Sequence, residues 1–252
     1  MTGMNLEEQS SQFKEQGFAV FPGILAGEAL GLLRAECDAF VAREDARMDA
    51  AGVDSIGISH RGKRYFANEC QRVVPSLRNV LFSNAMADVC RATLGDTAYF
   101  FFDQYVVKGP EGGMPFSWHQ DSGYVVGNGG PTDHAPYLTC WCPLDDATEE
   151  NGTVRLIPGS HKNGIIGHER KAGSNDLAVE PNAEGVLVEA KAGDVVAFSS
   201  LTLHATGANR STAPRRVYLA QYTPEAMLDP GTRQLRRNAI AFLQAGKQVT
   251  FA

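Results

Sequence analysis

Two short stretches, Trp118-His119-Gln120-Asp121 and Thr202-Leu203-His204-Ala205-Thr206-Gly207, decide how this chain of 252 residues is interpreted. Side chains alternate between the two faces of an extended strand, so His119 and Asp121 are expected on the same side of one strand. His204 would add a second imidazole from a distant part of the chain. Two imidazoles and one carboxylate form the facial set of mononuclear non-haem Fe(II) oxygenases, which leaves coordination positions open. The two stretches therefore predict a metal site of this kind at a strand end.

An arginine pair, Arg215 and Arg216, follows the second stretch and adds a candidate anion site. A guanidinium can pair with a carboxylate through two parallel hydrogen bonds, which is what the far carboxylate of a 2-oxo acid would need. Adjacent strand residues point to opposite faces, so only one of the two arginines can enter the interior. The other is expected to be a surface charge.

Composition limits the classes of partner. The net charge is −6, the isoelectric point is near 5.5 and 43% of the residues are hydrophobic. These values argue against nucleic acid or an anionic membrane as the main partner and allow a sizeable core. No apolar run has the roughly 18 residues of a membrane span, and residues 1–16 resemble neither a secretory signal nor a transit peptide.

The five cysteines indicate a reducing compartment. Their number is odd and most lie in apolar segments, so we expect reduced, buried thiols and a cytoplasmic protein. Cys140 and Cys142 could be considered as a metal pair. One intervening residue and the lack of a second pair favour strand packing instead.

The order of elements predicts a mainly β fold with flanking helices. Helices are expected at 6–16, 26–44 and 75–94, with a strand at 18–21. Further strands are expected at 98–108, 115–119, 137–144, 153–157, 185–190, 194–199 and 216–222, separated by turn residues. Short strands without evident helices between them favour an antiparallel sandwich or barrel. We predict one domain over 1–252: a mostly helical buttress (1–95), a core (96–225) and a C-terminal segment (226–252).

The long loops and the remaining histidines are also considered as parts of the site. The loops 123–136 and 162–182 are long enough to be lids or binding loops. His60, His134, His161 and His168 fall in expected loops without a partner at metal spacing, and we interpret them as exposed. With no thiolate, the ligand set suits Fe(II) or Mn(II); zinc remains open, although the helical His-Glu-x-x-His of many zinc hydrolases is absent.

At this level the chain resembles the phytanoyl-CoA dioxygenase-like oxygenases. Four pieces carry the resemblance, in the family's order: the opening segment 13–23, the first metal motif 118–121, the segment 145–161, and the stretch from His204 to Arg215. The resemblance implies a double-stranded β-helix (jelly-roll, cupin-like) core. It also selects Arg215, rather than Arg216, as the inward arginine.

The resemblance implies roles for the residues as well. His119, Asp121 and His204 would hold Fe(II), and Arg215 would pair with the distal carboxylate of the cosubstrate 2-oxoglutarate. Thr139 would face the cosubstrate, with Trp141 on the same side, and Gln104 and Lys108 could reach it; for Lys108, a position on the solvated face stays open. O2 would be consumed and succinate and CO2 released, with hydroxylation of an unactivated C–H bond. Related halogenases replace the carboxylate by a small residue, so Asp121 favours hydroxylation or desaturation.

The substrate is expected to be a small or medium metabolite. Candidate lining residues, aromatic or small and polar, are Phe116, Trp118, Gln120, Ser122, Tyr124, Tyr65 and Phe66. The competing interpretation is a non-catalytic, cupin-like metal- or ligand-binding protein, which would not need Arg215. A zinc hydrolase would be a third class, and it would stay active under argon.

Overall fold

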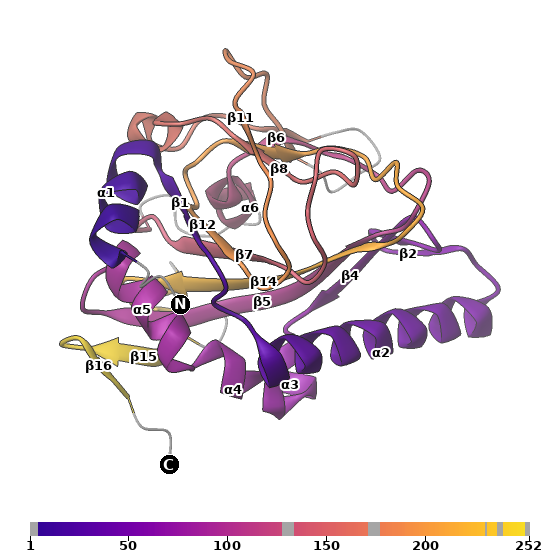
Figure 1. Cartoon of the computed structure of the whole chain (residues 1–252), viewed down its shortest axis with the longest axis horizontal. Helices are drawn as coiled ribbons and strands as arrows, with labels where there is room; N and C mark the ends of the chain where they lie inside the picture. The colour runs from indigo at the N-terminus through magenta and orange to yellow at the C-terminus, as the bar shows by residue number, and fades with distance from the viewer. Residues whose placement is uncertain (1–4, 128–133, 171–176, 230, 236–238, 250–252) are drawn as a thin grey trace.

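A large antiparallel sheet forms the base of the molecule (Figure 1). The structure is a computed structural model that describes residues 5–127, 134–170, 177–229, 231–235 and 239–249. In spatial order the main path of this sheet is β1 (Phe18–Phe21), β12 (Val195–Ser199), β7 (Leu138–Pro143), β14 (Arg215–Thr223), β5 (Ala98–Lys108), β4 (Arg64–Asn68), β3 (Ser59–His60) and β2 (Ser55–Ile56). Off this path, β15 (Ile240–Gln244) pairs with β5 and with β16 (Lys247–Gln248).

A second, smaller sheet faces the inner side of the first. Its order is β11 (Val186–Val188), β8 (Val154–Leu156), β13 (His204–Thr206) and β6 (Phe116–His119). A two-stranded ribbon, β9 (Glu169–Arg170) with β10 (Leu177–Ala178), adjoins it. The short helix α6 (Asp121–Gly127) lies between the two sheets (Figure 1). The predicted jelly-roll core is confirmed, whereas α6 is a helix where the sequence suggested only a loop.

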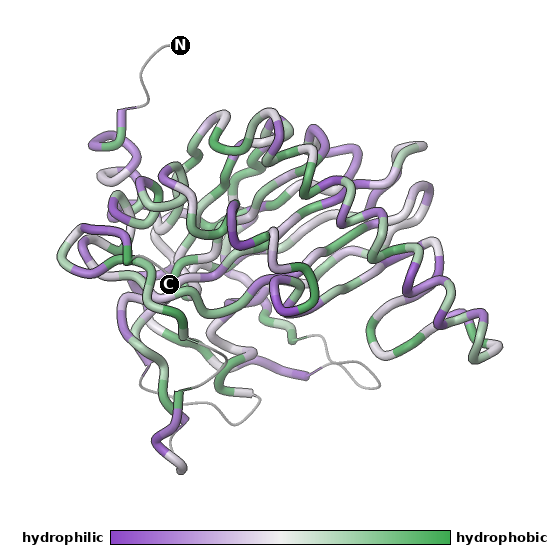
Figure 2. Tube along the Cα trace, turned by 90° about the horizontal axis from the view of Figure 1, so that it is seen from below, coloured by the Kyte–Doolittle hydropathy of each residue, from purple (hydrophilic) through white to green (hydrophobic). Residues whose placement is uncertain are grey.

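Helices cover the outer side of the large sheet. They are α2 (Gly27–Ala51), α3 (Cys70–Val73), η1 (Pro75–Leu77), α4 (Arg78–Leu81) and α5 (Asn84–Thr93), with α1 (Leu6–Gln16) at one end and η2 (Ser160–Asn163) after β8 (Figure 1). Seen from that side, hydrophobic and hydrophilic stretches alternate along the trace, as expected of elements with one packed face (Figure 2). No helix in the described part of the chain is long and apolar enough to cross a membrane.

Two helical predictions need correction. The helix expected at 26–44 continues to Ala51 and ends at Gly52, whose positive φ of 64° suits a glycine cap. The expected helix 75–94 is broken into η1, α4 and α5. The break has a local cause, because the Ser83 side chain accepts a hydrogen bond from the Met86 N–H and starts α5 anew.

The pleat of the large sheet separates two cores. Val107, Tyr218 and Cys140 face the helices, while their strand neighbours Val106 and Val217 face the small sheet. Trp141 and Phe198 join that inner core. Successive side chains alternate, so each strand contributes every second residue to the space between the sheets. That space contains the candidate site.

All five cysteines are free and buried, as predicted. Cys140 and Cys142 belong to the helix-side core, where they pack as small apolar residues. Burial raises the pKa of the Cys37 thiol to about 12, which keeps it protonated at neutral pH.

Candidate metal and cosubstrate site

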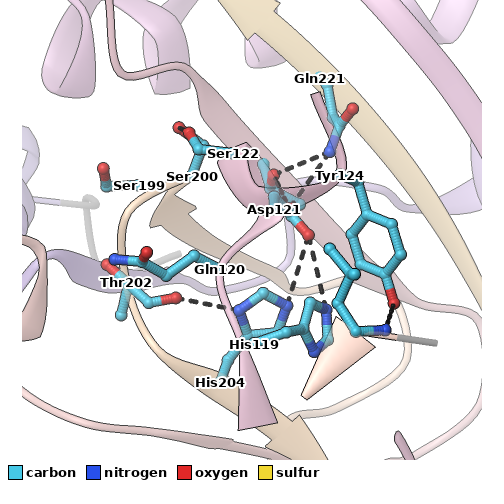
Figure 3. Close-up of polar contacts among 12 residues, drawn as sticks. His119, Gln120, Asp121, Ser122, Tyr124, Ser199, Ser200, Thr202, His204 and Gln221 are labelled. Atoms are coloured by element: carbon cyan, nitrogen blue, oxygen red, sulfur yellow. Dashed lines mark hydrogen bonds and ion pairs between the residues drawn. The ribbon is translucent and has the colours of Figure 1, made fainter. Parts of the chain in front are cut away.

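Two histidines and one aspartate converge between the sheets (Figure 3). His119 ends β6 and His204 begins β13, and the two residues are directly paired across these antiparallel strands. The Nε2 atoms of His119 and His204 lie 3.7 and 3.5 Å from Oδ1 of Asp121. Candidate ligand atoms of all three residues lie within 4.8 Å of one another. This spacing suits a single metal ion held on one side.

Asp121 reaches this position by a route that the sequence did not predict. It is the first residue of α6 rather than the end of an extended strand. The chain turns into the helix directly after Gln120, so strand alternation is not what brings Asp121 to the side of His119. The expected pairing of the two residues holds, but the reason is the turn.

The tautomers of both imidazoles are set by backbone carbonyls. His119 Nδ1 lies 2.7 Å from the carbonyl oxygen of Ser117, and His204 Nδ1 lies 3.0 Å from that of Thr202. A carbonyl only accepts, so Nδ1 must donate and Nε2 keeps its lone pair. Burial and the neighbouring His204 lower the pKa of His119 to about 4, which favours a neutral ring able to bind a metal.

The carboxylate of Asp121 is oriented through its other oxygen. The Thr139 hydroxyl donates to Oδ2 at 2.5 Å and the Gln221 amide donates to the same atom at 3.2 Å. Gln221 also donates to the Thr139 hydroxyl at 3.1 Å, which closes a small network. Oδ2 is therefore turned toward β7 and β14, and Oδ1 toward the imidazoles (Figure 3).

Arg215 is buried with unused hydrogen-bond capacity. Its side chain is on the wall of the cavity between the sheets and the residue is 1% exposed. Nη2 donates to the Gly152 carbonyl at 3.2 Å, whereas Nε and Nη1 have no partner within the described residues. Burial lowers its pKa to about 10, so it remains charged at neutral pH. A buried cation with free N–H groups fits a carboxylate ligand well, because such an anion would restore the missing bonds.

Arg216 points to the opposite face, as strand alternation requires. It pairs with Asp145 at 2.6 Å and with Asp38 at 2.9 Å on the helix side of the sheet. These two carboxylates raise its pKa. The structure thus separates the two arginines in the way expected.

Lys108 is fully buried beside Arg215, so the solvated-face interpretation is wrong. Its Nζ donates to the Thr206 hydroxyl at 2.6 Å and to the Gly207 carbonyl. Lys108 is directly opposite Arg215 on one side and Arg64 on the other. Burial, followed by these two cations, lowers the pKa of Lys108 to about 5. With this pKa Lys108 is uncharged at neutral pH, so the two arginines of this basic row supply its positive charge.

The cavity has a volume of about 370 Å³ and includes several predicted residues. Phe116, Tyr124, Gln104 and Trp141 are on its wall together with the metal-site residues and Arg215. Phe116 and His119 share this wall despite their odd spacing because the β6–β13 pairing is irregular between them. Thr139 lies behind Asp121, with its hydroxyl directed to that carboxylate.

Tyr65 does not face the cavity, and this prediction is corrected. Its ring belongs to the helix-side core and its hydroxyl donates to Asp45 of α2 at 2.8 Å. Its neighbour Phe66 is on the cavity wall instead. The alternation that separates Arg215 from Arg216 also separates this pair, and it could have been applied to β4.

Three residues next to the metal ligands in sequence support the structure and do not line the cavity. The Gln120 side chain is fully buried and bonds Gly164, Leu201 and Ile166. Ser122 is buried and donates to Ser200 at 2.8 Å. Trp118, half-buried, lies on the other side of β6 from His119, with the end of its indole next to Gly185. These contacts hold the turn that carries Asp121.

The other histidines are half-buried rather than exposed. His168 Nε2 accepts a hydrogen bond from the Gln120 N–H at 2.9 Å, and His134 Nε2 lies 3.0 Å from the Ser122 hydroxyl. Both support the turn from β6 into α6. In the predicted loop 123–136, residues 128–133 lie outside the described residues, as do 171–176 of the loop 162–182.

Sequence reasoning missed Gln221 and Asn68. Gln221 shares a strand face with Arg215, since 215, 217, 219 and 221 alternate inward, and it was therefore identifiable. Asn68 lies on the wall from β4, a strand that was not predicted.

Fold and site together define the chain as a mononuclear iron- and 2-oxoglutarate-dependent oxygenase on a double-stranded β-helix. A model of the phytanoyl-CoA dioxygenase (PhyH) family matches residues 13–217. The chain belongs to this family.

Relatives and solved structures agree with the assignment. The chain is 28% identical over 271 residues to the ectoine dioxygenase of Bordetella bronchiseptica, covering 96% of this chain and 84% of that protein. It is 31% identical over 157 residues to a probable alpha-ketoglutarate-dependent hypophosphite dioxygenase of Stutzerimonas stutzeri, covering 58% of this chain but only 52% of that protein. EvdO2 from Micromonospora carbonacea var. aurantiaca, complexed with 2-oxoglutarate, shares the fold with a TM-score of 0.71 and 22% identity, covering 93% and 96% of the two chains.

Proposed function

We propose that this oxygenase hydroxylates an unactivated C–H bond of a small or medium metabolite, with His119, Asp121 and His204 as the Fe(II) ligands. Arg215 pairs with the distal carboxylate of 2-oxoglutarate. The observation that carries the cosubstrate assignment is the buried guanidinium with two unpaired N–H positions on the cavity wall. A binding protein without turnover would have no need for this buried cation.

The cofactors supply the oxidising chemistry when bound: O2 is reduced while 2-oxoglutarate is decarboxylated to succinate and CO2. The chain supplies position and a dry pocket. Thr139 and Gln221 orient Asp121, and the two backbone carbonyls orient the imidazoles. Trp141, whose ring lies 5.4 Å from the Arg215 guanidinium, supports the cosubstrate end, and Gln104 is on the same cavity wall. Lys108 lies behind this end, directly opposite Arg215 on β5.

A carboxylate at position 121 supports hydroxylation over halogenation, because Asp121 would bind the metal where a halogenase has a small residue that leaves room for a halide. The cavity volume of about 370 Å³ supports a small substrate. Ligand pockets span roughly 300–1,000 Å³, and this cavity must hold both cosubstrate and substrate. The five free, buried cysteines support a place in the reducing cytoplasm.

The test is succinate formation from 2-oxoglutarate in air with Fe(II) and ascorbate. We expect slow, substrate-independent succinate release from the wild type and none from His119→Ala or Arg215→Ala. Arg216→Ala serves as the matched control and should retain release, because Arg216 faces the helices. Binding of iron and 2-oxoglutarate without succinate, even with a broad metabolite panel, would favour the non-catalytic alternative. Activity that persists under argon would favour a hydrolase.

A further inference from the structure

The cavity wall divides into two halves. The residues assigned above to iron and to the distal carboxylate come from β6, α6, β13, β7 and β14. The other half is over β4 and β5, where Phe66, Phe102 and Asn68 face the cavity. Gln104, on β5 next to β14, borders both halves. The β4–β5 half is free to contact a substrate.

Two carboxamides form a pair in this half. Asn68 and Gln104 occupy directly opposed positions on β4 and β5 and both are on the cavity wall. Within the described residues neither side-chain amide makes a hydrogen bond, in contrast to the amide of Gln221, which is used on Asp121. Directly opposed residues have Cβ atoms roughly 4.5–5.5 Å apart, so both amides can reach one ligand group. Each amide offers a donor and an acceptor.

The charges of the wall favour an uncharged ligand group here. In the complete site, divalent iron and the Arg215 guanidinium are balanced by the Asp121 carboxylate and the dianionic cosubstrate. Of the described charged side chains on the wall, this leaves Arg170, which is exposed on β9 and lies 3.5 Å from the Gly127 carbonyl. Solvent screens a charge at such a position. Arg64, whose guanidinium lies 5.4 Å from the Phe66 ring centroid, adds a buried cation at the opposite end of β4 from Asn68. Near Asn68 and Gln104 the charges of the described wall residues are thus balanced.

The rest of this half is aromatic. Phe66 packs edge-on against Phe116, with ring centroids 5.5 Å apart and an interplanar angle of 84°. Phe102 and Tyr124 add further ring surface to the wall. Such a lining suits a flat or cyclic apolar body. The shared volume leaves room for on the order of a dozen non-hydrogen atoms of substrate at protein packing density.

From these observations we infer that the substrate is a compact, uncharged ring compound bearing a neutral amide, lactam or equivalent donor–acceptor pair, which Asn68 and Gln104 bind. The inference rests on the proposed function and names the substrate class of the same site. It places substrate recognition on β4 and β5, apart from the anion-binding end at Arg215.

The experiment measures binding of matched probes to the full chain, loaded anaerobically with Fe(II) and 2-oxoglutarate. One trio is cyclohexanecarboxamide, cyclohexanecarboxylate and cyclohexylmethylamine; the second is benzamide, benzoate and benzylamine. Perturbation of the visible charge-transfer band of the iron–2-oxoglutarate complex gives each Kd without turnover. We expect at least one carboxamide to bind about tenfold more tightly than its acid and its amine.

Variants at Asn68 connect the preference to the residue. Asn68→Leu should remove most of the preference, and Asn68→Asp, with almost unchanged shape, should move it toward the amine. The control Asn163→Leu, at an exposed position on η2, should leave every Kd unchanged.

Three results would overturn the inference: tightest binding of the acids, no binding of either carboxamide, or a carboxamide preference that survives Asn68→Leu. A wild type that forms no charge-transfer band with iron and 2-oxoglutarate would instead contradict the proposed function. The two failures are thus distinguishable.

Discussion

At the scale of single residues, the position of Asp121 depends on hydrogen bonds to the oxygen that faces away from the imidazoles. Thr139 and Gln221 hold Oδ2, which leaves Oδ1 as the atom directed to the metal site. Groups that orient a ligand in this way affect metal affinity nearly as strongly as the ligand itself. The site therefore extends beyond its three ligands.

The first prediction concerns the Thr139 hydroxyl. Thr139→Val keeps the shape but removes the donor, so Fe(II) affinity should fall roughly ten- to hundredfold, measured by competition with a chelator. Thr139→Ser should restore most of it. Thr223→Val is the matched control, because Thr223 is equally buried near the end of β14 and its hydroxyl has no partner among the described residues. Equal loss in the control would show that the effect is general destabilisation.

The second prediction is that replacing Arg215 and replacing Arg216 change the free energy of unfolding in opposite directions. Arg215→Met removes a buried cation without an anion, so the free energy of unfolding of the cofactor-free protein should rise by about 1 kcal/mol or more. Arg216→Met breaks the pairs with Asp145 and Asp38 and should lower it by a similar amount. Urea unfolding measures both. A loss of stability in Arg215→Met would contradict the idea that its charge is uncompensated before the cosubstrate binds.

At the scale of elements, the break between α4 and α5 depends on a cap. Ser83→Ala removes the acceptor for the Met86 N–H, so we expect a loss of about 1 kcal/mol in unfolding free energy and a lower Tm. Ser76→Ala, at an exposed position in η1, is the comparison and should change stability little. A Tm for Ser83→Ala equal to that of the comparison would rule out the capping role.

Strand β5 carries a buried acid on its helix side, which predicts a pH dependence. Burial raises the pKa of Asp103 to about 6 from 3.8, so the folded state holds its proton more tightly than the unfolded chain. This group therefore makes stability decrease as pH rises from about 4 to 6, with little further change above. Asp103→Asn should gain stability relative to wild type between pH 4 and pH 7 in urea unfolding. The exposed Asp96→Asn should show no such trend, and a flat difference for Asp103→Asn would contradict the prediction.

Element type was predictable where the residue pattern was strong. The strand 98–108 and the helix 6–16 agree with β5 and α1, because long periodic segments carry a clear signal. β4 and β13 were missed, since few residues define them and their pairing partners are distant in sequence. The turn that places Asp121 on α6 also depends on tertiary contacts, such as those of Gln120 with Gly164 and Leu201.

The site was predictable to the extent that it follows alternation. Alternation predicted that one of Arg215 and Arg216 faces inward, and the family resemblance selected Arg215 and placed Trp141 on the same side; both residues line the cavity. The predictions for Gln120 and Ser122 were wrong, because proximity in sequence to a ligand was taken as proximity to the substrate. The prediction for Tyr65 was wrong because strand alternation was not applied to β4. The Tyr65 hydroxyl donates to Asp45 of α2, the Gln120 side chain accepts from the Ile166 N–H after η2, and the Ser122 hydroxyl donates to Ser200 after β12.

At the scale of the whole molecule, folding and cosubstrate binding are coupled. The large sheet places the buried Arg215 guanidinium opposite Lys108, and Nε and Nη1 of Arg215 have no partner among the described residues. A dianion at this end would supply the missing bonds and compensate the buried charge. We therefore expect 2-oxoglutarate to raise the Tm, with about 2.7 kcal/mol of stabilisation at a hundredfold excess over Kd. Arg215→Met should abolish the shift, and an unchanged shift in that variant would place the binding site elsewhere.

The basic row of Arg64, Lys108 and Arg215 also bears on how such a chain can diverge. Its members come from three neighbouring strands, and burial followed by the two arginines lowers the pKa of Lys108, so replacing either arginine changes the pKa of Lys108. A change of cosubstrate would thus require several coordinated replacements. Asn68 on β4 and Tyr124 on α6 line the cavity outside this row and outside the metal ligands, so each can be exchanged without changing either group. Single substitutions can therefore change the substrate, while the site for a dicarboxylate cosubstrate stays almost unchanged among related chains.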